Sequence, residues 1–366
     1  MRNLADTIHR LASQRAVGQR MGLGNTAIPD RLSLLENFGS NPAMLAAKIH
    51  IPARMAQNAP LVVTLHGCTQ SAASYAEGAG WVRLADEYGF ALLLPEQQRS
   101  NNPNLCFNWF VPENCRRDAG EALSIRQMIG AMVARYGIDQ KRIFINGLSA
   151  GGAMTSAMLA TYPEIFAGGG VIAGLPFACA GNVPEAFDRM RGHGLPGEHA
   201  LQNSVRNASQ HQGPWPTISV WHGTSDQTVA PENADAVVTQ WRGVNGLGPA
   251  PTRTSTGEGW SRRVWTNAEG RDLIEEYRIA GMGHGTPITT GGRPGDGIAG
   301  PFILDVGLSS TLALAASWKL VPAVNPVARA DIDASEASRP KLDTHQDGSI
   351  TKTIEDALRA AGLMRR

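Results

Sequence analysis

Short runs of apolar residues alternate with longer amphipathic stretches along the middle of the chain. The apolar runs have the length of buried strands and lie at residues 44–52, 61–67, 90–96, 142–147, 170–174, 217–223 and 273–281. The stretches typical of helices lie at residues 74–89, 120–136, 152–164 and 307–318. Apolar strands that alternate with helices predict a mostly parallel central sheet covered by helices on both faces. We therefore expect one α/β domain over residues 35–321.

The two ends of the chain depart from this pattern. Leu4, Ile8 and Leu11 repeat at helical spacing, which predicts an N-terminal helical segment over residues 1–34. Residues 322–366 begin with a stretch rich in Pro, Ala, Asp and Ser and end in an amphipathic pattern. This composition indicates a linker followed by a short C-terminal helix.

Composition and charge narrow the classes of function. Hydrophobic residues make up 42% and charged residues 18% of the chain, which is typical of a folded domain rather than a charge-driven disordered one. The 33 Lys and Arg residues against 32 Asp and Glu residues leave a net charge of +1. The chain therefore lacks the basic surface that nucleic acids or anionic membranes attract, and we expect neither as a partner. No oligomeric state is predicted.

Two further patterns bear on membranes and location. The uncharged stretches 143–163 and 165–184 have the length of a membrane span, but Gly, Pro and Asn residues interrupt them, so buried strands and helices are expected. The first fifteen residues carry charges throughout and hold no apolar core of a secretory signal. This predicts a cytoplasmic location.

No metal site is expected. The segment 343–354 matches a calcium-binding loop at some positions, but Ile354 stands where such a loop needs a bidentate Glu. None of the four cysteines, at positions 68, 106, 115 and 179, makes a CxxC pair typical of zinc or redox sites. Their even number permits two disulfides, whereas a cytosolic enzyme would keep free thiols, and both alternatives stay open.

The sharpest local feature is a G-x-S-x-G pentapeptide at residues 147–151, centred on Ser149. It lies between a predicted strand and a predicted helix, which is the setting of a nucleophile elbow. Glycines flank the serine because so tight a turn leaves no room for side chains. Ser149 is therefore the predicted nucleophile; the alternative is an ordinary helix N-cap serine.

A serine nucleophile needs a histidine to accept its proton and an acid to orient that histidine. In this architecture the three follow the chain order serine, acid, histidine, each just beyond a strand. Asp226 follows the sixth predicted strand and His284 the seventh, so they are the predicted acid and base. Asp296 and Asp305 are weaker candidates for the acid because they come after His284 in the chain.

Acyl transfer also needs two backbone N–H donors for the developing oxyanion. One is expected from Ala150, directly after the nucleophile, and the other from the loop after the second predicted strand, where Cys68 is best placed. His66 and His222 belong to His-Gly turns and are expected to hold loops together. Residues 193–211 are expected to form a polar loop region.

The segments HGCTQ, LCFNWF, GLSAGGAM, HGTSD and GMGHG, in this order, make the chain resemble the polyhydroxybutyrate (PHB) depolymerase-type esterases. These are α/β-hydrolases related to feruloyl and acetylxylan esterases, and the resemblance covers residues 35–320. It implies the α/β-hydrolase fold and a reaction that needs no cofactor. It also implies a catalytic triad and two oxyanion donors, namely Ser149, Asp226, His284, Cys68 and Ala150.

The resemblance further implies residues of the substrate cleft. Trp109 would line the cleft, and Gln70 and Trp221 are additional candidates for substrate binding; the alternative for Trp109 is a core tryptophan. The same resemblance suggests a Cys68–Cys106 disulfide that ties the oxyanion loop to the cleft wall, which leaves the other two cysteines.

The expected function is that of a serine carboxylic-ester hydrolase acting on short-chain hydroxyalkanoate oligomers or polyesters and related small esters. Secreted polymer degraders of this group carry a signal peptide and a polymer-binding domain, and neither is visible, which favours oligomers or small soluble esters. The family resemblance makes a secreted location the alternative to a cytoplasmic one. Alternative functions are a feruloyl or acetylxylan esterase, a serine peptidase or acyltransferase with the same triad, and a non-catalytic binding protein.

Overall fold

The computed structural model describes residues 31–293 and 295–323 of the 366-residue chain. Within the described residues, everything from Leu32 onward belongs to one compact unit. Most of the predicted N-terminal helical segment, the linker and the C-terminal helix lie outside the described residues, but Ser33 and Leu34, which were expected in the helical segment, form a strand instead. None of the helices in the described part has the length and apolar character needed to span a bilayer.

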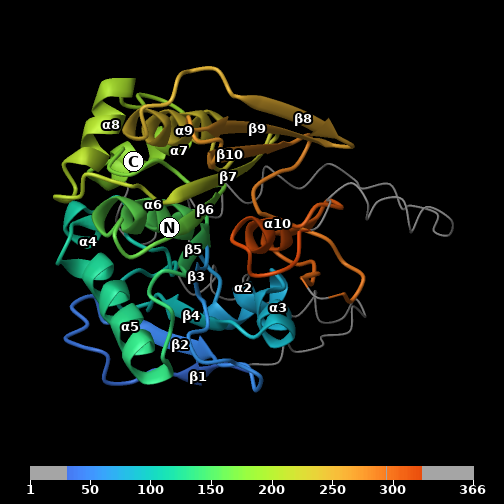
Figure 1. The fold of residues 1–366 in the computed structure, drawn as a ribbon. Coiled ribbons are helices and arrows are strands. Elements are labelled where there is room, and N and C mark those ends of the chain that lie inside the picture. Colours follow the sequence, from blue (N-terminus) through green and yellow to red (C-terminus); the bar gives the residue numbers. More distant parts are fainter. Residues whose placement is uncertain (1–30, 294, 324–366) are drawn as a thin grey trace, which may run out of the picture. The chain divides into compact units, whose positions relative to one another are not determined.

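Ten strands of the described residues form one sheet and two more form a small separate ribbon (Figure 1). In chain order the strands are β1 Ser33–Leu34, β2 Ala46–His50, β3 Leu61–Leu65, β4 Ala91–Glu96, β5 Ile143–Leu148, β6 Gly168–Ile172, β7 Thr217–Gly223, β8 Arg253–Gly257, β9 Trp260–Thr266, β10 Asp272–Ile279, β11 Thr286–Ile288 and β12 Ile303–Asp305. The helices are α2 Ala72–Gly78, α3 Trp81–Tyr88, α4 Pro112–Cys115, α5 Gly120–Tyr136, α6 Ala150–Thr161, α7 Val183–Met190, α8 Glu198–Arg206, α9 Glu232–Val244 and α10 Ser310–Ser317.

The large sheet has the strand order β1-β2-β4-β3-β5-β6-β7-β10-β9-β8. Its six central strands, from β4 to β10, pair in parallel, whereas β1 and β2 at one edge and β9 and β8 at the other pair antiparallel. The prediction of an open, mostly parallel sheet is therefore confirmed. The carboxyl ends of the central strands all meet at one edge, which is where such folds bind their ligands.

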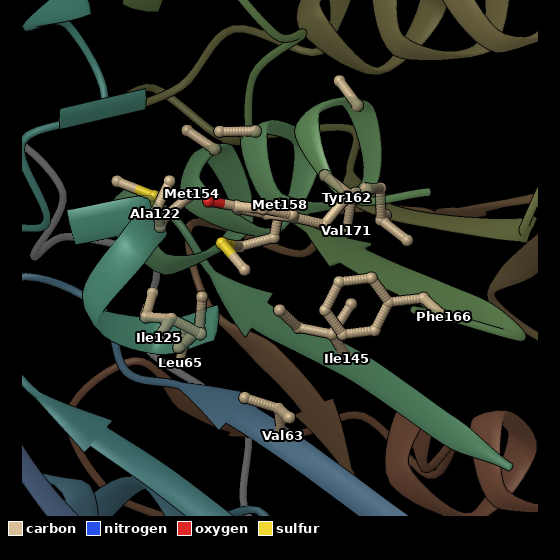
Figure 2. Close-up of a cluster of buried hydrophobic side chains, with 14 of the residues drawn as sticks. Val63, Leu65, Ala122, Ile125, Ile145, Met154, Met158, Tyr162, Phe166 and Val171 are labelled. Carbon is tan, nitrogen blue, oxygen red and sulfur yellow. The ribbon is translucent and has the colours of Figure 1, made fainter. Parts of the chain in front are cut away.

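Each face of the sheet carries its own apolar core, because successive side chains of a strand point to opposite faces. On β3, Val63 and Leu65 belong to a core with α5, α6 and α9, and Figure 2 draws both side chains within the same cluster as Met154 and Met158 of α6. Val62, the residue before Val63, points to the opposite face and belongs to a second core with α2, α3 and α10. The predicted helical cover on both faces is confirmed (Figure 1).

Two sequence-based expectations differ from the structure, and some elements were not predicted at all, namely β1, β8, β9, β11, β12, α4, α7 and α9. The helix expected over 74–89 is broken into α2 and α3 at Gly80, whose φ of +83° favours glycine and where an added Cβ would overlap the Asp296 carbonyl oxygen. The region expected to be a polar loop contains α8, with His199 on it, and is preceded by α7. Each of these helices has a narrow apolar face among many polar residues, so its overall composition resembles that of a polar loop.

An aromatic stack fixes α10 to the sheet. The ring of Trp318, directly after α10, lies between Phe144 of β5 at 4.8 Å and Trp81 of α3 at 5.9 Å, and both pairs are nearly parallel. All three side chains are buried. Aromatic stacking of this kind adds to the free energy gained by burying the rings.

We expect Trp318→Ala to lower the free energy of unfolding by about 3–5 kcal/mol, because it leaves a cavity between two buried rings. The control Tyr88→Ala removes an aromatic side chain that is 41% exposed, and it should change stability by about 0.5 kcal/mol or less. Urea unfolding followed by circular dichroism measures both. Equal stability losses in the two variants would contradict a structural role for the stack.

Candidate active site

Ser149 occupies a sharp turn between β5 and α6. Its φ of 58° and ψ of −118° place it in a strained region that serine rarely adopts. The surrounding backbone holds it there: the Ser149 N–H donates to the Ile172 carbonyl at 2.9 Å, and the Ser149 carbonyl accepts from the Ala153 N–H at 2.9 Å. The predicted strand–turn–helix setting is present.

Two flanking glycines make this turn possible. A Cβ on Gly151 would overlap the carbonyl oxygens of Leu65 and His66 at the end of β3. A Cβ on Gly147 would overlap the carbonyl oxygen of Gly151. The turn therefore packs backbone against backbone, and only glycine fits at both positions.

Asp226 and His284 form a hydrogen-bonded pair. Asp226 lies in the loop after β7 and His284 in the loop after β10, and the His284 Nδ1 is 2.7 Å from the Asp226 Oδ2. The other carboxylate oxygen of Asp226 accepts from the N–H groups of Thr228 and Val229, both at 2.9 Å. Both oxygens of the buried carboxylate are thus engaged, which fixes its orientation.

The electrostatics favour an ionised Asp226. Burial by itself raises the pKa of this carboxyl, but attraction to His284, together with hydrogen bonds from His222 and His284, outweighs burial and holds the pKa well below its usual range. The fully buried His222 contributes through its Nε2, 3.4 Å from the Asp226 Oδ2 and 2.8 Å from the Val229 carbonyl oxygen. His222 therefore braces the loop that carries Asp226, as expected of a His-Gly turn.

The loop after β3 carries Cys68, which is joined to Cys106 by a disulfide. This confirms the pairing that the family resemblance suggested. In the described part of the chain, neither the Cys68 N–H nor the Ala150 N–H donates a hydrogen bond. Cys115 and Cys179 are free and buried, and burial raises the pKa of both thiols.

A cavity of about 290 Å³ opens where these loops meet. Ser149, Ala150, His284 and Cys68 all contribute to its wall. Most of the remaining wall is apolar and includes Trp109, Phe110, Leu175, Val183, Ala186, Phe187, Met190, Val229 and Phe302. The structure thus brings four of the predicted site residues to one apolar cavity, with Asp226 behind His284.

The three predicted substrate-binding residues take different positions. Trp109 lines the cavity, although only 8% of it is exposed. Gln70 is not part of the cavity wall: its Oε1 accepts from the Gly67 N–H at 2.9 Å, so it braces the loop that carries Cys68. Trp221 is fully buried and stacks on Tyr277 at 3.7 Å, which places it in the core of the sheet away from the cavity wall.

Sequence reasoning missed the side of the cavity formed by α7. Val183, Ala186, Phe187 and Met190 recur on this helix at spacings of three and four, the only sequence signal that marks them as one face. Phe302, from the segment before β12, also lines the cavity and lies 6.0 Å from the His284 ring. Within the described residues, no cluster of His, Cys, Asp and Glu side chains could hold a metal ion.

Comparison with known proteins agrees with this architecture. The profile of the family described as esterase PHB depolymerase matches residues 45–263. A poly(3-hydroxyalkanoate) depolymerase C of Paucimonas lemoignei is 45% identical over 283 residues, which are 76% of this chain and 68% of that protein. A feruloyl esterase B of Talaromyces stipitatus is 30% identical over 273 residues, 72% of this chain and 74% of that protein.

Among solved structures, an acetyl xylan esterase from Aspergillus awamori matches with a TM-score of 0.64 and 25% identity. The match covers 69% of this chain and 93% of that one. The α/β-hydrolase fold and the resemblance to PHB depolymerase-type esterases, both predicted from the sequence, are confirmed.

We expect Gly151→Ala to destabilise the protein by about 3 kcal/mol or more, because the added methyl group has to displace the backbone of β3. The matched control is Gly248→Ala, where an added Cβ meets nothing within 4 Å, and it should be neutral within about 1 kcal/mol. Thermal unfolding of the purified variants compares them. A Gly151→Ala protein as stable as Gly248→Ala would show that the turn relaxes at little cost.

Proposed function

We propose that this chain, which belongs to the esterase PHB depolymerase family and is a carboxylic ester hydrolase, cleaves its substrates with a triad of Ser149, His284 and Asp226. The observation that carries this proposal is the 2.7 Å contact between His284 and Asp226 at the wall of a cavity that Ser149 also lines. The proposed substrates are esters of short hydroxyalkanoate oligomers or polyesters and related small esters.

The protonation states follow from the hydrogen bonds. An ionised Asp226 accepts only, so the His284 Nδ1 carries a proton and donates it to the carboxylate. The Nε2 of the neutral ring then keeps its lone pair and acts as the base. As Ser149 Oγ attacks the ester carbonyl, its proton passes to Nε2, and Asp226 stabilises the imidazolium that results.

The carbonyl oxygen gains negative charge in the tetrahedral intermediate. In the proposal, the N–H groups of Cys68 and Ala150 bind this oxyanion. Their lack of partners in the described part of the chain supports the assignment, as does the position of Ala150 at the first turn of α6, where the helix dipole favours negative charge.

The remaining steps reverse the roles of the same groups. The imidazolium of His284 protonates the departing alcohol, which leaves an acyl group on Ser149 Oγ. A water molecule then attacks this ester, His284 Nε2 accepts its proton, and collapse of the second tetrahedral intermediate releases the acid and restores the serine.

The cavity favours small, uncharged acyl groups. Its volume lies at the low end of the roughly 300–1,000 Å³ typical of ligand pockets. His284 is the only titratable side chain among the lining residues, so a free carboxylate or ammonium group entering the cavity would lose hydration without a partner. The chain of a short hydroxyalkanoate ester carries neither a carboxylate nor an ammonium group between its ends. The similarity to a poly(3-hydroxyalkanoate) depolymerase also supports hydroxyalkanoate esters as substrates.

We expect Ser149→Ala to reduce turnover of p-nitrophenyl butyrate by about 10³- to 10⁶-fold, because no other group replaces the nucleophile. The control Ser156→Ala removes a buried hydroxyl on the same helix that has no hydrogen-bond partner among the described residues, and it should leave activity unchanged. Initial rates of the purified wild type and both variants measure this difference in turnover. Activity that survives in Ser149→Ala refutes the proposed mechanism.

We expect Met190→Trp to shift the preference toward short acyl chains, because a larger side chain on α7 narrows the apolar wall. The value of kcat/KM should fall by about tenfold or more for p-nitrophenyl octanoate and by less than about threefold for the acetate. Asp188→Ala, on the exposed side of α7, is the control and should keep the wild-type ratio. The same ratio in Met190→Trp would mean that the acyl chain does not lie along α7.

A further inference from the structure

Glu121, the second residue of α5, carries a buried carboxyl group, with 1% of the residue exposed. Three N–H donors converge on it: the Gln97 Nε2 at 2.7 Å, the Asn108 Nδ2 at 2.7 Å, and the Asn108 backbone N–H at 2.9 Å. Only an ionised carboxylate accepts from all of them without presenting a proton of its own. Its partners among the described residues are uncharged amides, so no cation offsets the charge.

One arm of this network reaches the far side of the Cys68 loop. The Asn108 side-chain oxygen accepts from the Asn102 Nδ2 at 3.0 Å, and the Asn102 oxygen accepts from the Asn104 N–H at 3.0 Å. The Asn104 carbonyl then accepts from the Thr69 N–H at 2.7 Å. Hydrogen bonds therefore run without a break from Glu121 to the residue after Cys68.

A second arm reaches the near side of the same loop. The Gln97 side chain that donates to Glu121 also donates to the Cys106 carbonyl at 3.1 Å. The Gln97 backbone N–H donates to the His66 Nε2 at 3.1 Å, so the His66 Nδ1 carries the proton and donates it to the Gly67 carbonyl at 2.8 Å. This arm ends at the residue before Cys68 and at the disulfide partner of Cys68.

We propose that Glu121, as a carboxylate, is a positioning residue that holds the Cys68 N–H where an oxyanion donor must lie. The proposal rests on the proposed function, in which this N–H binds the oxyanion. The two arms restrain Gly67 and Thr69 on either side of Cys68, and the disulfide to Cys106 adds a third restraint. An oxyanion donor loses its value when it is displaced by a fraction of an ångström, so these restraints act on the chemical step.

The positioning depends on pH through Glu121 itself. Burial raises the pKa of this carboxyl to about 7, against the opposing effect of the hydrogen bonds from Asn108 and Gln97. As the pH falls through this value, the carboxyl gains a proton that points at groups which are themselves donors, and the network loosens. The active form is therefore the one present above about pH 7.

Of the other titratable groups around the network, Cys115 and His66 stay uncharged near neutral pH, and Glu96 contacts a different part of the chain. The Cys115 thiol of α4 faces Glu121, and burial raises its pKa well above the usual range. Burial lowers the pKa of His66, which keeps the ring neutral. Glu96, at the end of β4, faces His66 rather than Glu121, and its carboxylate accepts from the Ala72 N–H at 2.7 Å.

The test compares the full-length wild type with Glu121→Gln in the hydrolysis of p-nitrophenyl butyrate between about pH 5 and pH 9. The amide has the shape of the carboxyl but places its own N–H donors against the converging ones. We expect kcat at about pH 8 to fall by about 10- to 100-fold while KM changes by less than about threefold. Thermal unfolding is measured on the same samples.

The acid limb of the pH profile separates positioning from a merely structural role. If only His284 has to lose a proton, log(kcat/KM) rises with a slope of about 1 per pH unit. A second required deprotonation at Glu121 makes the wild-type limb steeper, and Glu121→Gln should return the slope to about 1. A wild-type slope of about 1 overturns the proposal, and this measurement needs no variant to fold.

The matched control is Glu77→Gln, the same change at a buried carboxyl of α2, on the other face of the sheet. We expect its kcat to stay within about twofold of the wild-type value and the acid limb of its pH profile to keep the wild-type slope. If Glu121→Gln keeps the wild-type kcat and the wild-type slope of the acid limb while Ser149→Ala is inactive, the positioning role of Glu121 is refuted and the proposed triad still stands. Activity that survives in Ser149→Ala instead refutes the triad, so the two failures are distinguishable.

Discussion

The close approach of α6 to the end of β3 is the constraint on which the site depends. Because Gly147 and Gly151 carry no side chains, the turn at Ser149 packs directly against the backbone of the neighbouring strand. This contact brings Ala150 and the loop that carries Cys68 to the wall of one cavity. Strain in the serine backbone is offset by the hydrogen bonds on either side of it, and the fold thereby brings together a hydroxyl group and two N–H groups that donate to no other described residue.

The parallel sheet supplies the rest of the geometry. Strands β3, β5, β7 and β10 run in the same direction, so the loops at their carboxyl ends meet at one edge of the sheet. Asp226 and His284 are 58 residues apart in sequence yet 2.7 Å apart in space, because β7 and β10 are neighbours. The acid gains its low pKa from that adjacency, since burial alone would raise the pKa of Asp226.

How much of this could be predicted depended on whether the signal was local. The G-x-S-x-G turn, the apolar strands and the helix at 120–136 depend on residues close in sequence, and they were predicted nearly to their ends. The placement of Trp221 in the core could not be predicted, because a tryptophan near the end of a strand suits either face of the sheet until its packing partner, Tyr277, is known. The wall formed by α7 was missed because its apolar face is spread among polar residues.

Glu121 is the clearest case of a residue whose role no sequence pattern reveals. An acidic residue in the first turn of a helix is ordinary, and it usually lies in solvent near the helix dipole. Here the same position is buried, and the donors come from segments that approach it only in the folded chain. An unpaired buried charge costs stability, so its retention calls for a compensating use. The hydrogen bonds that lead from Glu121 to both sides of Cys68 provide that use, because they make the placement of a backbone N–H depend on one carboxylate.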